Sequence, residues 1–205
     1  MQFILKKLLC LMGGAMLVVV SYCQKISIEP FYIGDRVPDI QLNNIVNYKD
    51  SIINLSHFGD KMVILDFWNI HCGSCIKMFA KEDSIQQLLK QDIQFLLVTT
   101  DKKEDVEKFI EKYNKIHARL PFPIVIRDKS LRQLFRFKFV PHYVWIAPNG
   151  LILAQTSDNL INKEAILKAL APFRVLEKRL KGLKSTNYGL HMQPPSQELS
   201  ILLNN

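Results

Sequence analysis

Two cysteines separated by two residues, Cys72 and Cys75, are the side chains of this 205-residue chain with the clearest capacity for chemistry. A C-x-x-C pair can exchange disulfides, ligate a metal ion or attach haem. Haem attachment needs a histidine directly after the second cysteine, where this chain has Ile76. A structural zinc site wants four ligands, and only His71 or His142 could join the two thiolates. The spacing leaves redox chemistry and metal binding open.

The position of the pair favours redox chemistry. A continuous apolar run at 62–67 predicts a buried central strand, and a helical pattern begins at Ser74. Cys72 therefore lies at or just before a helix N-terminus, where N–H groups and the helix dipole stabilise a thiolate. We expect Cys72 to be the exposed nucleophile and Cys75 the more buried thiol that resolves the mixed disulfide. Gly73 would permit close approach by a substrate chain.

Alternating strand and helix patterns predict the fold around the pair. The first helix has Phe79, Ile85 and Leu88 on its apolar side, and a Pro-Asn-Gly turn at 148–150 signals a hairpin. Strands are expected at 40–46, 62–67, 93–99, 124–126, 140–146 and 151–154, and helices at 74–90, 102–114, 130–137 and 162–170. This order predicts an α/β fold, a three-layer sandwich on a mixed sheet.

Residues 1–23 predict an export signal. Two lysines precede an apolar run at 8–20 that is too short for a confident membrane span, and a cleavage site follows Cys23. Acylation of Cys23 as a lipoprotein, or an uncleaved anchor, are the alternatives. We therefore expect the protein in the periplasm or cell envelope, with residues 24–33 as a linker.

Removal of the signal leaves Cys72 and Cys75 as the only cysteines of the mature chain. An exported protein enters an oxidising compartment. A disulfide between residues three apart closes almost no loop and stabilises a fold little. Redox chemistry or metal binding therefore explains the pair better than scaffolding does.

The charge pattern argues against a nucleic-acid partner. The formal net charge is +8, but the lysines of the stretch 102–115 alternate with glutamates and aspartates. Such a pattern is typical of a solvated helix face, and no basic motif is interleaved with aromatic residues. We expect no nucleic acid to bind.

The segment 66–75 (DFWNIHCGSC) resembles the thioredoxin active-site segment. Matches at 34–39 (GDRVPD), at Val140-Pro141 and at 148–150 make the chain similar to the TlpA/ResA-like branch of exported thiol–disulfide oxidoreductases. The resemblance implies a thioredoxin-like domain over 34–175, with an N-terminal extension and an inserted helix after Thr100. Residues 176–205 would form a C-terminal extension without assigned chemistry.

The resemblance also implies roles for single residues. Cys72 and Cys75 match the redox pair, and Pro141 matches a cis-proline that packs beside the disulfide. Val140 would present backbone groups to an extended substrate, with His142 next to it. The alternative for Pro141 is a proline that simply begins a strand.

Asp66 and Trp68 match two further positions of the superfamily. Asp66 corresponds to a buried acid whose pKa burial should raise, so that it could exchange a proton with the resolving thiol. It could equally be a hydrogen-bonded structural acid. Trp68 would cover one side of the cysteine pair as part of the substrate site, although a core tryptophan would give the same pattern.

The chain departs from the family pattern at several positions. His71 replaces a tryptophan, and a protonated imidazole there would stabilise the thiolate and make the pair more oxidising, unless it is simply exposed. Gly73-Ser74 differs from the Gly-Pro of general reductants, so the redox potential cannot be carried over. Met78 stands where ResA-like proteins often have a glutamate, and Ala80 replaces a proline that kinks the helix.

The resemblance suggests a monomeric reductase of the cell envelope that acts on oxidised protein thiols. A membrane electron donor would reduce it again, and it would need no cofactor or metal beyond the Cys72–Cys75 disulfide. A disulfide oxidase or isomerase is the alternative of the same class. A copper- or zinc-binding thiol module is another alternative, although copper-handling relatives generally space their cysteines three apart. A redox-silent envelope domain fits an intact pair poorly.

Overall fold

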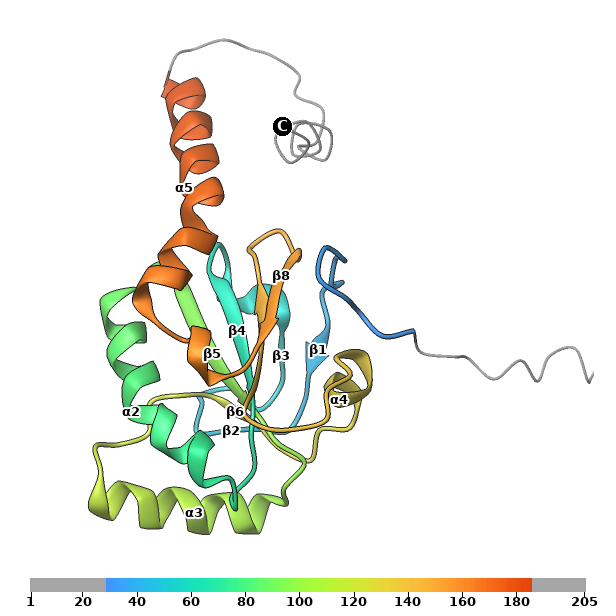
Figure 1. Cartoon of the computed structure of the whole chain (residues 1–205), viewed down its shortest axis with the longest axis vertical. Helices are drawn as coiled ribbons and strands as arrows, with labels where there is room; N and C mark the ends of the chain where they lie inside the picture. Colours follow the sequence, from blue (N-terminus) through green and yellow to red (C-terminus); the bar gives the residue numbers. More distant parts are fainter. Residues whose placement is uncertain (1–28, 186–205) are drawn as a thin grey trace, which may run out of the picture.

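The computed structural model describes residues 29–185 (Figure 1). The expected signal at 1–23, including Cys23, lies outside the described residues, as does the chain after 185. The elements in chain order are β1 (Gln41–Leu42), β2 (Ile45–Val46), β3 (Ile53–Asn54), η1 (Leu55–Phe58), β4 (Met62–Phe67), α2 (Gly73–Leu88), β5 (Ile93–Val98), α3 (Lys103–Ile116), β6 (Ile124–Val125), α4 (Ser130–Leu134), β7 (His142–Ile146), β8 (Ile152–Thr156), η2 (Asp158–Leu160) and α5 (Lys163–Ser185).

β4 lies inside a six-stranded mixed sheet with the strand order β2-β6-β5-β4-β7-β8. It pairs in parallel with β5 and antiparallel with β7. All of its residues are buried, including its one acid, Asp66, as expected for a largely apolar strand between two covered faces of a sheet. The predicted central strand and mixed sheet are confirmed.

Successive side chains of β4 point into two different cores, because a strand alternates its side chains between the faces of a sheet. Met62 and Ile64 join a core that α2, α3 and α5 cover. Val63 and Leu65 join a second core under α4, η1 and the small β1–β3 sheet. Figure 1 shows these elements on opposite sides of the sheet, so the predicted three layers are confirmed.

Two differences from the expected elements have local causes. The edge strand expected at 40–46 is divided into β1 and β2 because Asn44 has a positive φ of 57°, which turns the chain between them. Leu88 was placed on the apolar side of α2 but is 65% exposed. It is the last residue of the helix and faces away from the core, whereas the following residue, Leu89, is buried in the core under α2.

The last helix is longer than expected. α5 continues through the boundary placed at 175 and ends at Ser185, with Pro172 inside it. Asn162 caps its start as predicted, accepting a hydrogen bond from the Ala165 N–H at 2.9 Å. Arg174 holds the helix to the α2–β5 turn through two hydrogen bonds to Asp92, at 2.6 and 3.0 Å. Within residues 29–185, no helix has the length and apolar character needed to cross a membrane.

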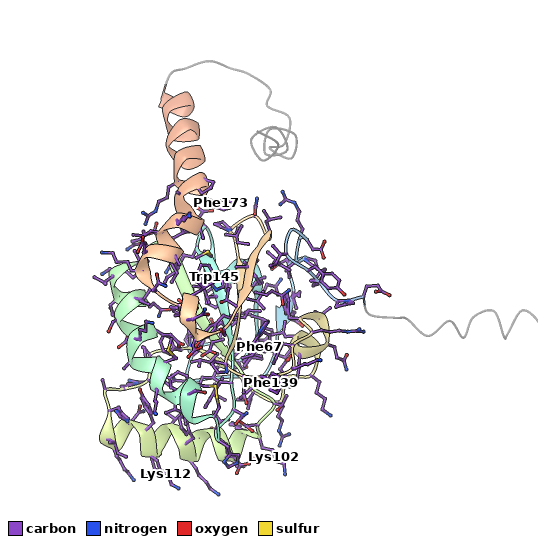
Figure 2. The ribbon with its side chains drawn as sticks, viewed as in Figure 1. Phe67, Lys102, Lys112, Phe139, Trp145 and Phe173 are labelled. Atoms are coloured by element: carbon purple, nitrogen blue, oxygen red, sulfur yellow. A yellow bond between two sulfur atoms is a disulfide. The ribbon has the colours of Figure 1, made fainter. Side chains whose placement is uncertain are left out.

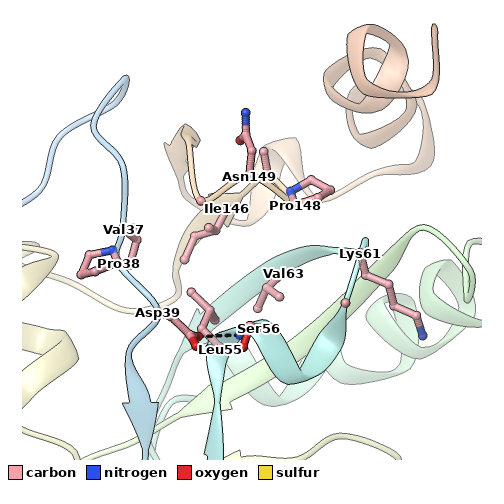
Figure 3. Close-up of a pocket in the computed structure, with 13 residues that line it drawn as sticks. Val37, Pro38, Asp39, Leu55, Ser56, Lys61, Val63, Ile146, Pro148 and Asn149 are labelled. Carbon is pink, nitrogen blue, oxygen red and sulfur yellow. Dashed lines mark hydrogen bonds between the residues drawn. The ribbon is translucent and has the colours of Figure 1, made fainter. Parts of the chain in front are cut away.

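The matched segments 34–39 and 148–150 meet at the end of the sheet away from the cysteines. The Gly34 N–H donates to the Ile152 carbonyl at 3.0 Å and the Val37 N–H to the Gly150 carbonyl at 2.9 Å. Figure 3 shows the pocket between them, with Asp39 on its wall. Asp39 accepts hydrogen bonds from the backbone and side chain of Ser56 and from Asn54, which lower its pKa. These segments therefore organise the fold rather than the chemistry.

Candidate active site

The two cysteines form a disulfide across the first turn of α2, with their Cα atoms 5.3 Å apart. Cys72 is the N-cap residue of the helix and is partly exposed. Cys75 is 0% exposed and belongs to the core under α2. Of the two cysteines only Cys72 is even partly exposed, which is consistent with the expected division between attacking and resolving thiols; that division stays a prediction.

The surroundings of the Cys72 sulfur are those that stabilise a thiolate. The Cys75 N–H donates to Cys72 Sγ at 3.2 Å, and the Ser74 hydroxyl lies 3.4 Å from the same atom. A thiolate has no proton to give, so both neighbours would donate to it. The 16-residue helix behind them adds the positive end of its dipole.

The loop between β4 and α2 is held in place by the neighbouring strand. Asp101, just after β5, accepts a hydrogen bond from the Ile70 N–H at 2.8 Å and another from the Thr99 hydroxyl at 2.8 Å. Asn69 accepts one from the His71 N–H at 2.9 Å. These bonds fix the approach of the chain to Cys72, and the sequence patterns did not identify Asp101 or Asn69.

Pro141 follows a cis peptide bond from Val140, as the resemblance implied. The strand β7 begins directly after it, and its first residue, His142, is the register partner of Phe67 at the end of β4. The proline therefore lies at the end of the sheet from which the chain continues to the cysteines. Val140 and Cys72 both pack against the core under α2.

Asp66 lies inside the protein beneath α2 together with an acid that the sequence analysis did not identify, Glu82. Both are 0% exposed. Burial and the nearby Glu82 carboxyl hold the pKa of Asp66 well above its usual value, and burial raises the pKa of Glu82 to about 7. The Tyr143 hydroxyl donates to Glu82 Oε1 at 2.6 Å. Glu82 follows Phe79 by three residues, and this helical spacing was the signal that could have revealed it.

Comparison with known proteins agrees with this geometry. The model of the AhpC/TSA family matches residues 33–154, which is more than half of the chain. The chain belongs to the AhpC/TSA family. It is 30% identical over 172 residues to the thiol-disulfide oxidoreductase ResA of Oceanobacillus iheyensis, covering 80% of this chain and 86% of that protein. It is 28% identical over 141 residues to ResA of Geobacillus kaustophilus, covering 67% and 76%.

A solved structure supports the same assignment within the AhpC/TSA family. The putative thiol:disulfide interchange protein DsbE from Chlorobium tepidum is 27% identical, with a TM-score of 0.58, and the match covers 68% of this chain and 99% of that one. Together with the Cys72–Cys75 disulfide, these relatives make the chain a ResA-like thiol–disulfide oxidoreductase on a thioredoxin-like fold.

Trp68, expected beside the cysteine pair as part of the substrate site, lies inside the protein. Its side chain is 2% exposed and packs against Phe79 and Phe109, with ring centres 5.2 and 5.1 Å away. This packing fits the alternative, a core tryptophan, because the residue continues the side of β4 that faces the core under α2. Contact of Trp68 with a substrate stays a prediction.

The remaining predicted substrate contacts lie around the disulfide. His71 and Gly73 are exposed, and apart from its chain neighbours and the backbone of its own helix no described atom lies within 4 Å of the position that a Cβ on Gly73 would occupy. His142 is half-buried, stacks on Phe137 at 4.5 Å and lies 3.3 Å from Gln155 Oε1. Burial lowers the pKa of His142. Contact of these residues with a substrate stays a prediction.

The metal-binding alternative has no further support from the described residues. Among the side chains that the structure describes, those of residues 29–174, His, Cys, Asp and Glu form no group of three or more that could hold a metal ion. His142 is committed to Phe137 and Gln155, and the two sulfurs are joined to each other.

Proposed function

We propose that this chain is an exported reductant of protein disulfides in the cell envelope. The observation that carries the proposal is the accessible Cys72 sulfur at the start of α2, with the buried Cys75 one turn further on and Pro141 at the same end of the sheet. The signal-like sequence at 1–23 supports export. ResA of Oceanobacillus iheyensis is named a thiol-disulfide oxidoreductase, which supports the reaction class.

In the proposed reaction the Cys72 thiolate attacks a substrate disulfide. The substrate S–S bond breaks, one substrate sulfur leaves as a thiolate, and the other forms a mixed disulfide with Cys72. Cys75 then loses its proton and attacks Cys72 Sγ, which expels the second substrate thiolate. Two electrons have passed to the substrate, and the protein is left with the Cys72–Cys75 disulfide. A membrane electron donor would restore the dithiol.

The proposed substrate is an extended segment of an oxidised protein that lies beside Val140. Phe139, immediately before it, is 81% exposed although it is a large apolar residue. Figure 2 places Phe139 toward the same end of the sheet as Phe67, away from Trp145 and Phe173. Such a side chain offers apolar contact to a chain that has reached Cys72.

A redox titration tests the direction of electron flow. A midpoint near that of thioredoxin, about −270 mV, is expected for a reductant, whereas a midpoint near that of DsbA, about −120 mV, would contradict reduction. The variant Cys75→Ser should trap a mixed disulfide at Cys72, and Cys72→Ser should trap none. Trapping at neither residue would argue against disulfide exchange altogether.

A further inference from the structure

Three carboxylate oxygens lie inside the protein without a hydrogen-bond donor among the described residues. They are both Oδ atoms of Asp66 and Oε2 of Glu82. The remaining oxygen, Glu82 Oε1, accepts the Tyr143 hydroxyl at 2.6 Å. Two ionised carboxylates in such a place would be very unfavourable, because each would be both desolvated and next to a like charge.

The fold brings the two acids together from different elements. Asp66 on β4 is the register partner of Tyr143 on β7, so their side chains leave the same face of the sheet. Glu82 lies on the buried side of α2 with Cys75 and Phe79, at intervals of four and three residues. The resolving thiol and the two carboxyls therefore share the interface between α2 and the sheet.

A hydrogen bond between the two carboxyls forms only when one of them holds a proton. That proton also satisfies an oxygen for which no N–H or O–H donor is present. Asp66 and Glu82 each influence the pKa of the other through such a bond and, for Asp66, through the Glu82 charge. The pair therefore titrates as one unit, in two steps that belong to both residues.

The other ionisable groups around the Asp66–Glu82 pair leave its protonation state dependent on pH near neutrality. Tyr143 on β7 and Lys81 on α2 favour ionised Glu82. On α3, Tyr113 has its pKa raised in part by Glu82, and Asp158 of η2 acts on Tyr143. Among the described groups that act on the pair, Lys81 is the cation, and its side chain is exposed.

We propose that Glu82 is a positioning residue for the proton that leaves Cys75: with Asp66 it forms a buried carboxyl pair that holds one shared proton and accepts a second from the Cys75 thiol. This role rests on the proposed disulfide exchange. When Cys75 gives its proton to the pair, its thiolate attacks Cys72 Sγ and the substrate thiolate leaves. The pair then returns the second proton through solvent to the released thiolate.

The test follows the resolving step against pH. A substrate mixed disulfide is formed at Cys72, and release of the substrate thiol is timed between about pH 5 and pH 9 in the full chain. Glu82→Gln, which keeps the shape but cannot ionise, should move the inflection of this profile by about one pH unit, or tenfold in rate on its sloping limb. The matched control Asp83→Asn removes an acid from the next position of α2 and should leave the profile unchanged.

A second measurement separates the proposal from a structural role and from the proposed function. Infrared spectra of the wild-type protein should show a protonated carboxyl at neutral pH; its band should shift in Glu82→Gln, where Asp66 is left without its partner carboxyl, and should be lost in the double variant Asp66→Asn/Glu82→Gln. The Cys75 thiol pKa, measured without any substrate, should shift in Glu82→Gln. A Glu82→Gln protein that loses thermal stability but keeps the wild-type profile and Cys75 pKa would overturn the proposal, as would a wild type without a protonated carboxyl. A wild type that shows the shared proton yet reduces no protein disulfide would refute the proposed function alone.

Discussion

The two sulfur atoms have the same chemistry and different surroundings, and the difference supports the roles proposed for them. The Cys72 sulfur accepts a hydrogen bond from the Cys75 N–H, and the residue is partly exposed. Both features favour a thiolate that can attack. Cys75 is enclosed, with two buried carboxyls on the same interface, which disfavours a free thiolate until its proton has left. In the proposed reaction Cys72 therefore attacks first, and Cys75 reacts only after its proton has been transferred.

The buried carboxyls should make the stability of the oxidised protein depend on pH. Their folded-state pKa values are raised, so between about pH 5 and pH 7 the folded protein holds protons that the unfolded chain has lost. The free energy of unfolding must then fall as pH rises through this window. Glu82→Gln should flatten the fall by up to about 1.4 kcal/mol per pH unit, as measured by urea unfolding at several pH values.

His142 acts in the opposite direction over the same window. Its folded-state pKa is lowered, so it contributes stability that is lost as pH falls below about 6.5. The comparison between wild type and Glu82→Gln cancels this contribution, because both proteins keep His142. Unfolding curves whose pH dependence is the same in both proteins would show that Glu82 is ionised alike in the folded and unfolded states.

At the scale of elements, the turn of the β7–β8 hairpin depends on one residue, Gly150, for its contribution to stability. Gly150 has a φ of 83°, and a Cβ built on it would lie 2.7 Å from the Val37 carbonyl oxygen. Gly150→Ala should therefore lower the free energy of unfolding by about 1–3 kcal/mol, through backbone strain and through separation of the N-terminal segment from the hairpin.

Chemical denaturation measures this loss, and Gly73→Ala is the matched control. Gly73 has no positive φ, and apart from its chain neighbours and the backbone of its own helix no described atom lies within 4 Å of the position of its added Cβ. It also begins α2, where alanine is a better helix former than glycine. A Gly150→Ala protein as stable as the control would mean that the hairpin can shift without cost.

The main elements of the fold could be predicted because each has a strong local signal. The apolar run of β4, the charged helix α3 and the Pro-Asn-Gly turn all depend on near neighbours in the sequence. The spacing of Glu82 after Phe79 places it on the apolar side of α2, but no pattern in the sequence pairs it with Asp66, because a charged residue on a helix is ordinarily solvated and only the packing of α2 on the sheet buries it. The length of α5 was missed because Pro172 indicates a helix end, whereas the helix continues past it.

At the scale of the whole molecule, the two ends of the sheet carry different features. One end joins the N-terminal segment to the hairpin and fixes the fold, while the other carries the disulfide, Val140-Pro141 and the exposed Phe139. A substrate protein therefore has one end at which to bind, and an exposed phenylalanine next to Val140 should contribute to binding rather than to stability.

Phe139→Ser should raise KM for an oxidised protein substrate by about fivefold, as expected for a loss of about 1 kcal/mol of apolar contact. Reduction of a small disulfide such as oxidised glutathione should keep its rate, because it needs only the Cys72 sulfur. Leu88→Ser is the matched control: Leu88 is also exposed, at 65%, but it ends α2 at the opposite end from Cys72. If both substrates slowed equally, Phe139 would act on the disulfide itself, and if neither changed, the substrate would approach Cys72 from another side.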